Sequence, residues 1–466
     1  MSRIIEIFNT YIFGPALPIV IFSAGIFLII KYGSFIFLKP VSVIKVLTKK
    51  NEKGGMSPLK TAILALASTL GVGNIVGVST AIYSGGAGAV FWLTISAVVA
   101  MAIKYGEVVL AVKYRVKNGG EYRGGAMYYM KDCLNNKRLS IIFAILCILN
   151  ALMVGNIVQI NAVKESVLSV MSVRPVNIGL CMAIIIFISI CRGTKRISSI
   201  TAKIIPFATV VYTLLSVYII IMNIGRIGEI IQLIIKEAFS VKAISGGIGG
   251  YAIVRSVRYG VARGIMSNEA GSGTSPIAHA KTDLKSPVEQ GFWGIFEVFA
   301  DTVVMCNLTA FVILLSYKEY VCEKGLTGME LVLRSYGRYA GKTAEMIIII
   351  SILMFAYATV ICQGFYGREC VYYLSEKKTS IELYTITYCI AAVVGSVISS
   401  ELLWGMTDFN ISLMTVINTV CILIASGEIK KATDEYFKTK KGDISLPEKS
   451  TSIQRLRRSE YQRISK

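Results

Sequence analysis

The feature that most constrains this sequence is the repetition of long apolar stretches along nearly its whole length. A helix that crosses a membrane needs about 20 mostly apolar residues, and this chain of 466 residues supplies them repeatedly between short clusters of charged residues and glycines. Only 17% of the residues are charged and the mean hydropathy is +0.63, whereas soluble domains average about 25% charged residues. The sequence therefore predicts an all-α integral membrane protein.

We count eleven candidate spans, at residues 11–31, 58–83, 88–114, 139–171, 176–191, 204–224, 251–275, 288–316, 343–366, 381–400 and 405–427. The first has no basic region directly before it and no small-residue cleavage site after it, so we expect it to stay in the mature protein. Ten cysteines occur without the paired spacing of zinc sites or disulfide frameworks. We interpret them as small core residues.

Basic residues are distributed unevenly between the two sides of the predicted membrane. When the spans alternate in direction, 34 of the 49 Lys and Arg residues fall on one side. Cytoplasmic loops carry this excess, so we expect a cell-membrane protein with its N-terminus outside and its C-terminus in the cytoplasm. The net charge of +21 then reflects orientation, and no nucleic-acid-binding motif accompanies it.

Two spans are interrupted by residues that disfavour a continuous membrane helix. The second contains Gly71-Val72-Gly73-Asn74 at its middle, and the seventh contains the polar run from Ser267 to Pro276. A helix in lipid must satisfy its own backbone, so we predict that both are unwound there. Close helix packing is the alternative explanation for the glycines.

The two breaks also predict the organisation of the chain. Spans two and seven are five apart, as in two five-helix repeats of inverted orientation, and matched broken helices indicate a transporter's binding site. An unwound helix offers N–H groups to a carboxylate and carbonyls to a cation, which suits a zwitterion carried with Na⁺. The predicted parts are an extra helix with a cytoplasmic loop (1–57), the first repeat (58–224), an extracellular connection (225–250), the second repeat (251–427) and a basic cytoplasmic tail (428–466).

Several motifs, in the same order, resemble those of the bacterial and archaeal alanine or glycine:cation symporter family. They extend from about Gly55 to Gly427 and include the runs 71–78, 113–115, 124–129, 155–161, 260–271, 276–279, 301–302 and 365–370. The resemblance implies eleven helices in a leucine-transporter-like fold, with helices 2–6 and 7–11 as the inverted repeats. It also implies import of a small neutral amino acid with Na⁺, with H⁺ as an alternative coupling ion and no other cofactor.

The resemblance further implies where substrate and sodium bind. Sodium would bind oxygens of Leu70, Gly73 and Thr359. The substrate would contact Gly71, Val72, Gly73, Asn74, Asn156, Gln159, Asn161, Met266, Thr359 and Gln363. Hydrogen bonds between helices are the alternative role for the amides of span four, and bonding to its own helix is the alternative for Thr359.

Two positions depart from the family pattern. Gln363 replaces a typical Trp, and Met266 replaces a common Phe. Both changes remove aromatic volume, and a buried amide needs a polar partner. We therefore expect a roomier and more polar pocket, suited to serine, threonine, asparagine or glutamine better than to alanine or glycine.

Charged residues within the spans also need partners. Glu107 lies three residues from Lys104, and we expect an ion pair between them. We expect Glu269, Asp301 and Arg263 to interact around the second break. Asp408 is expected near the membrane interface.

The sequence does not carry the common motifs of enzymes. The sequence has no His-Glu-x-x-His motif, no Gly-x-Ser-x-Gly elbow and no P-loop lysine, so an enzyme is not predicted. A transport-deficient amino-acid sensor of the same fold and a sodium-channel-like protein stay open as alternatives. The expected partners are a small neutral amino acid, Na⁺ and the lipid bilayer, with no nucleic acid and no obligate protein partner.

Overall fold

The computed structural model describes residue 8 and residues 14–38, 40–47, 56–191, 193–239 and 248–440. Outside the described residues lie the predicted N-terminal tip, part of the first loop, residues 240–247 of the connection and the tail beyond residue 440. Within them, eight helices are long and apolar enough to cross a membrane, and one bent pair makes a ninth. The all-α membrane architecture is confirmed, while the count of eleven spans stays a prediction.

Helices make up nearly all of the described first half. Its elements are α2 (Gly14–Leu28), η2 (Ile29–Gly33), α3 (Phe35–Leu38), α4 (Pro40–Leu47), α5 (Pro58–Thr69), η3 (Val72–Asn74), α6 (Val76–Gly85), α7 (Gly88–Lys113), the antiparallel hairpin β1 (Val116–Asn118) and β2 (Glu121–Arg123), α8 (Ala126–Asp132), α9 (Lys137–Leu152), η4 (Met153–Ile157), α10 (Val158–Leu168), α11 (Pro175–Cys191), α12 (Thr194–Met222), η5 (Ile224–Arg226) and α13 (Ile227–Ala238).

The described second half is entirely helical between its turns. Its elements are α14 (Ile248–Asn268), α15 (Pro276–His279), α16 (Pro287–Val298), η6 (Phe299–Cys306), α17 (Asn307–Leu314), η7 (Tyr317–Glu323), α18 (Gly328–Leu374), α19 (Lys378–Val397), α20 (Ser400–Ile424) and α21 (Ser426–Lys440).

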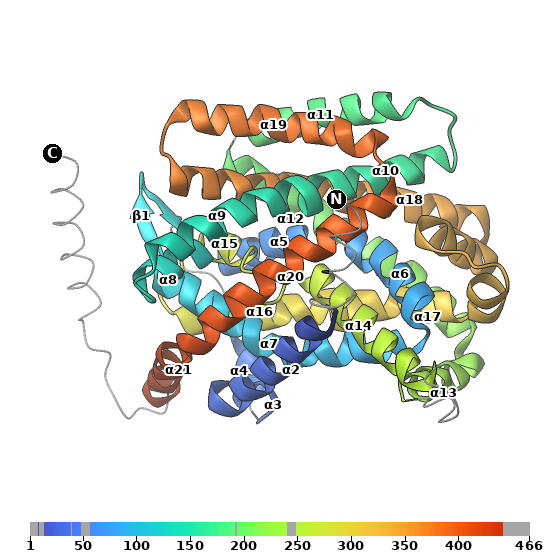
Figure 1. The fold of residues 1–466 in the computed structure, drawn as a ribbon, viewed down its shortest axis with the longest axis horizontal. Helices are drawn as coiled ribbons and strands as arrows, with labels where there is room; N and C mark the ends of the chain where they lie inside the picture. Colours follow the sequence, from blue (N-terminus) through green and yellow to red (C-terminus); the bar gives the residue numbers. More distant parts are fainter. Residues whose placement is uncertain are drawn as a thin grey trace, which may run out of the picture.

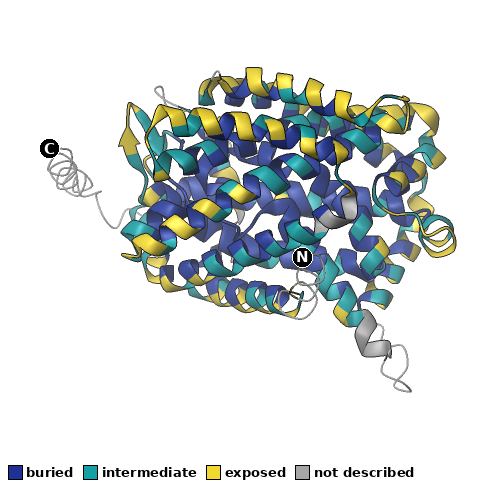
Figure 2. Ribbon diagram, turned by 45° about the horizontal axis from the view of Figure 1, so that its top comes forward, coloured by how far each residue is buried: buried dark blue, intermediate teal, exposed yellow. Residues whose placement is uncertain are grey.

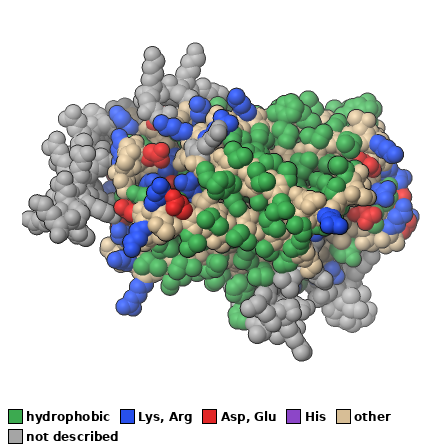
Figure 3. Space-filling model, turned by 90° about the horizontal axis from the view of Figure 1, so that it is seen from above, with side chains coloured by type: hydrophobic (Ala, Val, Ile, Leu, Met, Phe, Trp, Pro, Cys, Tyr) green, Lys and Arg blue, Asp and Glu red, His purple; other side chains and the backbone are tan. Residues whose placement is uncertain are grey.

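The arrangement in space is that of a membrane protein with polar ends. The β-hairpin, α8 and α21 lie at one end, which we call the α21 end, and α13 lies at the other, the α13 end (Figure 1). Exposed residues follow the outer helices, whereas the central helices are buried (Figure 2). Hydrophobic side chains cover the middle of one face and charged side chains gather mainly at its two ends (Figure 3). This apolar band matches the hydrocarbon core of a bilayer.

Both predicted helix breaks are present. Helices α5 and α6 are bent by 62° at the first break. Helix α14 ends at Asn268, and a turn leads to the short helix α15. Spans four and eight are continuous helices that each contain a π-helical segment, η4 and η6.

Two regions differ from the sequence expectation. Helix α18 begins at Gly328, earlier than predicted, and is interrupted by non-helical backbone at Ala340 and Gly341. The start of the tail is helical too: in α21, Ile429 and Thr433 are buried and the Thr433 hydroxyl lies 2.7 Å from that of Tyr105. These two residues lie where the first part of the tail packs on the rest of the protein, since α21 contacts α7 and α16.

Candidate functional site

The first break is short and built around Gly71. Helix α5 ends at Thr69, Leu70 leaves the helical conformation, and Gly71 is extended before the 3₁₀ turn η3. A Cβ atom on Gly71 would lie 2.7 Å from Thr359 Oγ1 and 3.0 Å from Gln159 Oε1. Only glycine therefore lets α18 and α10 bring these two side chains against the unwound backbone.

Side chains satisfy the N–H groups that this break frees. The Gly71 N–H donates to Asn74 Oδ1 at 3.0 Å. The Val72 N–H donates to Gln159 Oε1 at 3.1 Å. The structure thus brings Gln159 to the break, as the resemblance implied.

The last carbonyls of α5 face the hydroxyl of Thr359. Its Oγ1 lies 3.0 Å from the Ala67 carbonyl oxygen and 3.4 Å from that of Leu70, and donates toward them. Thr359 therefore bonds to a neighbouring helix, not to its own. Gly73 faces the other way, since its Cβ would lie 3.4 Å from Ser267 Cα. Ala67 was missed because a backbone carbonyl leaves no side-chain signal in a sequence.

The other span-four amides point away from the break. The Asn156 amide donates to the Tyr388 carbonyl at 2.6 Å, and the Asn161 amide donates to the carbonyls of Gly395 and Ile398 at 3.2 and 2.9 Å. All three carbonyls belong to α19 or the residue after it. These contacts are hydrogen bonds between helices, which is the alternative role expected for the amides of span four.

The second break is a longer turn that holds a carboxylate. Glu269, Gly271 and Gly273 have φ values of 53°, 82° and 78°, in the left-handed region. The Thr274 hydroxyl donates to Glu269 Oε2 at 2.6 Å, and the Gln363 amide donates to Glu269 Oε1 at 2.5 Å. The buried Gln363 thus has the polar partner that its amide requires.

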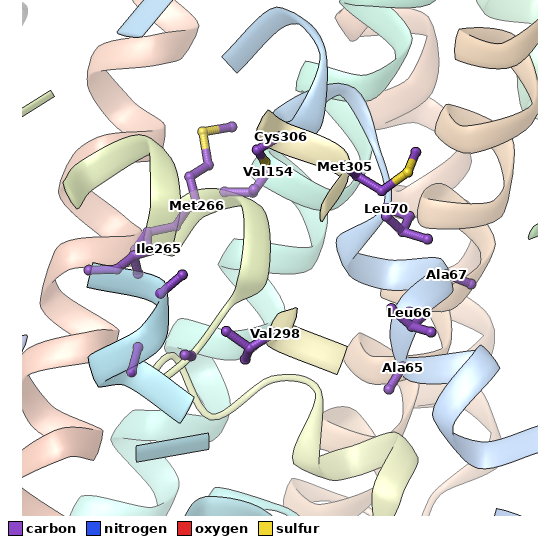
Figure 4. Packing of buried hydrophobic residues seen from close by; sticks show 14 of the residues in the cluster. Ala65, Leu66, Ala67, Leu70, Val154, Ile265, Met266, Val298, Met305 and Cys306 are labelled. Carbon is purple, nitrogen blue, oxygen red and sulfur yellow. The ribbon is translucent and has the colours of Figure 1, made fainter. Parts of the chain in front are cut away.

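Asp301 links the two breaks. Its Oδ1 accepts a hydrogen bond from Asn74 Nδ2 of the first break at 2.7 Å. Its Oδ2 accepts one from the Ser267 hydroxyl of the second break at 2.7 Å and one from Thr302 at 2.7 Å. Figure 4 shows the apolar residues around this region, with Leu70 of the first break, Met266 before the second, and Met305 and Cys306 after Asp301.

Arg263 does not take part in this cluster, which corrects the expectation for the second break. Its guanidinium forms two hydrogen bonds with the Asp408 carboxylate, at 2.5 and 3.2 Å. One turn of helix separates it from the break, and its Nη1 also lies 3.6 Å from the sulfur of Met266. The Arg263–Asp408 pair lies on the α13 side of the breaks.

A group of buried charges lies beside the second break. The Lys104 ammonium is 3.5 Å from Glu107 and 3.3 Å from Glu297, and donates to the Ser275 hydroxyl at 2.6 Å. His279 Nε2 lies 2.7 Å from Glu297 Oε2. The predicted Lys104–Glu107 pair is therefore present, and it extends into a larger cluster.

The α21 side of the breaks has ion pairs of its own. Glu369 Oε2 lies 2.9 Å from Arg123 Nη1 and 3.2 Å from Lys281 Nζ. The residues of both breaks, Gln159, Thr359 and Gln363 are all buried. The structure is thus closed around its centre, with ion pairs on both sides.

Known proteins that resemble this chain identify its family. Residues 1–450 match the model of the sodium:alanine symporter family. The sodium/alanine symporter AgcS of Methanococcus maripaludis is 34% identical over 445 residues, covering 93% of this chain and 97% of that protein. The probable sodium/glutamine symporter GlnT of Bacillus subtilis is 32% identical over 444 residues, covering 95% and 92%.

Solved structures resemble the fold at low sequence identity. A crystal structure of MhsT in complex with L-phenylalanine has a TM-score of 0.60 at 11% identity, covering 82% of this chain and 93% of that one. An Eremococcus coleocola manganese transporter has a TM-score of 0.52 at 12% identity, covering 83% and 81%. Both share the leucine-transporter-like fold. The family and its named relatives are transporters, not enzymes, and this multi-pass membrane chain belongs to the sodium:alanine symporter family.

Proposed function

We propose that this protein imports a small neutral amino acid together with Na⁺ by alternating access. The observation that carries the proposal is the meeting of two broken helices at a buried centre, closed by the Arg263–Asp408 pair on one side and by Glu369 with its partners on the other. A carrier needs a site that can be shut from both compartments. Membership of the sodium:alanine symporter family supports the same activity.

The amino acid's carboxylate would bind at the first break. Gln159 Oε1 now accepts the Val72 N–H, so a neutral oxygen occupies the place that a carboxylate oxygen would take. On binding, the substrate would accept this N–H and Gln159 would turn its amide nitrogen toward the substrate. Gly71, Val72, Gly73 and Asn74 would form the rest of the cradle.

Sodium would bind between α5 and α18. The carbonyls of Ala67 and Leu70 and the hydroxyl of Thr359 already face one another, and hard cations prefer such oxygens. Sodium bound here would stabilise the substrate-competent form. Substrate and sodium would then raise each other's affinity equally.

The side chain of the substrate would face Gln363 and Met266. The Gln363 oxygen is buried and has no hydrogen-bond partner among the described residues, so a substrate that donates a hydrogen bond would satisfy it. We therefore favour serine, threonine, asparagine or glutamine over alanine and glycine. The likeness to a protein named as a probable sodium/glutamine symporter supports this class.

The test is uptake of all twenty labelled amino acids into proteoliposomes under an imposed Na⁺ gradient. Saturable, Na⁺-dependent uptake competed best by serine or glutamine is the expected result. Alanine and glycine as far the best competitors would refute the polar pocket. Binding without uptake would mark a sensor, and Na⁺ flux that does not saturate or respond to substrate would mark a channel.

A further inference from the structure

The α21 side of the molecule holds two cations that share one buried carboxylate. Lys281 follows α15 and is 6% exposed, and Glu369 of α18 is 8% exposed. Glu369 Oε2 lies 3.2 Å from Lys281 Nζ and 2.9 Å from Arg123 Nη1. Glu121 also approaches Lys281, at 3.5 Å, but its side chain is 44% exposed. One buried carboxylate thus serves as the partner of two cations.

Both cations keep hydrogens that no described residue accepts. Lys281 Nζ is buried and has no hydrogen-bond partner among the described residues, although two carboxylates lie within ion-pair distance. Arg123 Nε is likewise buried without a partner in the described part of the chain. An ammonium carries three hydrogens and a guanidinium five, and a buried donor without an acceptor is costly. The two cations therefore have the donors to bind a further negatively charged oxygen.

One face of α18 connects these cations with the centre of the molecule. Residues three or four positions apart lie along this face: Thr359, Gln363, Tyr366 and Glu369. Thr359 and Glu369 are about 15 Å apart along the helix axis. Between them the buried Tyr366 hydroxyl donates to Ser68 Oγ of α5 at 3.0 Å. A substrate that leaves the centre along α18 would pass Tyr366 and then meet the two cations.

Opening of the molecule on this side would part the cations from their carboxylate. Lys281 lies beyond the second break, and Arg123 ends β2 of the hairpin at the α21 end (Figure 1). Glu369 belongs to α18 instead. Separation of α18 from α15 would break the Lys281–Glu369 pair, and a charge left without its partner in a protein interior is costly. A carboxylate that arrives from the centre would offset this cost.

We propose that Lys281 and Arg123 form a second subsite for the substrate, which receives the carboxylate of the amino acid as it leaves the centre toward the α21 end. This inference rests on the proposed function. In the closed structure Glu369 occupies the subsite, just as Gln159 Oε1 takes the place of the carboxylate at the first break. Because the substrate compensates the charge that opening exposes, the loaded protein opens toward this end more readily than the empty one.

The test compares the affinity for L-serine at the two ends of the full-length protein. Exchange of labelled L-serine is measured in right-side-out and inside-out vesicles with equal Na⁺ on both sides, and a C-terminal tag identifies the vesicles that expose the α21 end. Lys281→Met should raise KM at the α21 end about tenfold and leave KM at the α13 end unchanged. Lys281→Arg keeps the cation and should restore most of the affinity.

Glu369→Gln distinguishes a substrate subsite from an ion pair that only closes the protein. Lys281→Met and Glu369→Gln break the same pair, so a purely structural pair predicts that KM changes in the same direction. The subsite predicts a lower KM at the α21 end in Glu369→Gln, because a neutral carboxamide competes less well with the carboxylate of the substrate. Lys378→Met removes an exposed cation of α19 and is the matched control, with both KM values unchanged.

A second measurement needs no transport. In purified Glu369→Ala, acetate should occupy the space of the missing carboxylate and raise the thermal transition more than chloride does at the same concentration. Adding Lys281→Met to this variant should abolish the difference between the two anions. Gel filtration in detergent establishes that each variant is folded.

Specific outcomes would overturn the inference. KM values that change in the same direction in Lys281→Met and Glu369→Gln would refute the subsite. An equal response of Glu369→Ala to acetate and chloride would do the same. If no amino acid crosses the membrane under any gradient, the proposed function fails, while the acetate measurement still decides whether the two cations bind a carboxylate.

Discussion

The two helix breaks occupy corresponding places in the chain but are chemically different. The first exposes backbone groups to neutral side chains, chiefly Asn74, Gln159 and Thr359. The second is a turn with left-handed residues that holds Glu269 and borders the Lys104 cluster. Similar interruptions of two helices therefore do not imply similar roles. Under the proposed function the first break receives a ligand, whereas the second is shaped by its own backbone and charges.

The strongest test compares one glycine from each break. Gly71 has an extended φ of −136°, which any residue adopts, so Gly71→Ala should fold. Its Cβ would displace Thr359 and Gln159, and misplaced binding groups can cost about 100-fold in rate. We expect uptake to fall by at least about that factor, with a smaller fall in the thermal transition than a left-handed glycine of the second break would show when replaced by alanine.

Gly273→Ala should show the opposite pattern. Its φ of 78° costs an L-residue about 1–2 kcal/mol, and its Cβ would lie 2.6 Å from Phe143 Cζ. We expect a clearly lower thermal transition and poorer expression. Equal losses of stability in both variants would remove the contrast between the breaks.

The next test concerns the oxygens of the first break. Thr359→Ala should raise the Na⁺ concentration for half-maximal uptake by roughly tenfold or more, because the variant lacks a hydroxyl that is proposed to bind sodium. Thr359→Ser keeps the hydroxyl and should restore most of the affinity. If Thr359→Ala lowered expression without changing the Na⁺ dependence of uptake, the role of Thr359 would instead be packing.

A smaller change is expected where the second break meets the pocket. Gln363→Trp removes the amide that bonds to Glu269 and introduces the aromatic residue that the sequence resemblance implies for this position. Competition by glutamine should weaken about tenfold relative to alanine, a size typical of a lost polar contact or steric exclusion in a pocket. Unchanged competition would place Gln363 outside the substrate's reach. Gly155 lies directly against Gln363, so backbone adjustment there is the first thing to check in a variant that fails to fold.

The smallest effect should come from a charge far from both breaks. A hydrogen bond from Lys113, 2.5 Å away, lowers the pKa of the Glu428 carboxyl. A lowered pKa stabilises the fold above the ordinary carboxyl pKa and loses this effect as the pH falls through the lowered value. Glu428→Gln should therefore cost less than about 1 kcal/mol at neutral pH. Thermal scans of both proteins should converge in acid, and a persistent gap would show that the charge is not the cause.

Local sequence signals predicted the breaks, because glycines and polar residues stand out within apolar spans. They also predicted that Gln363 would need a polar partner, since a buried amide is costly alone. Which partner it finds was not predictable, because Glu269 is 94 residues away. The Arg263–Asp408 pair, 145 residues apart, was missed for the same reason. Such pairs depend on how distant helices pack.

Asp301 and Thr302 lie inside η6, a π-helical segment of an otherwise α-helical span. A π turn carries one residue more than an α turn, and such turns are frequent at functional sites. If that extra residue moved along the helix, the side chains on either side of it would rotate relative to each other by about 100°, the angle of one residue. A shift of the π turn along span eight would thus turn the Asp301 carboxylate toward or away from its neighbours, while the backbone hydrogen bonds of the helix stay intact.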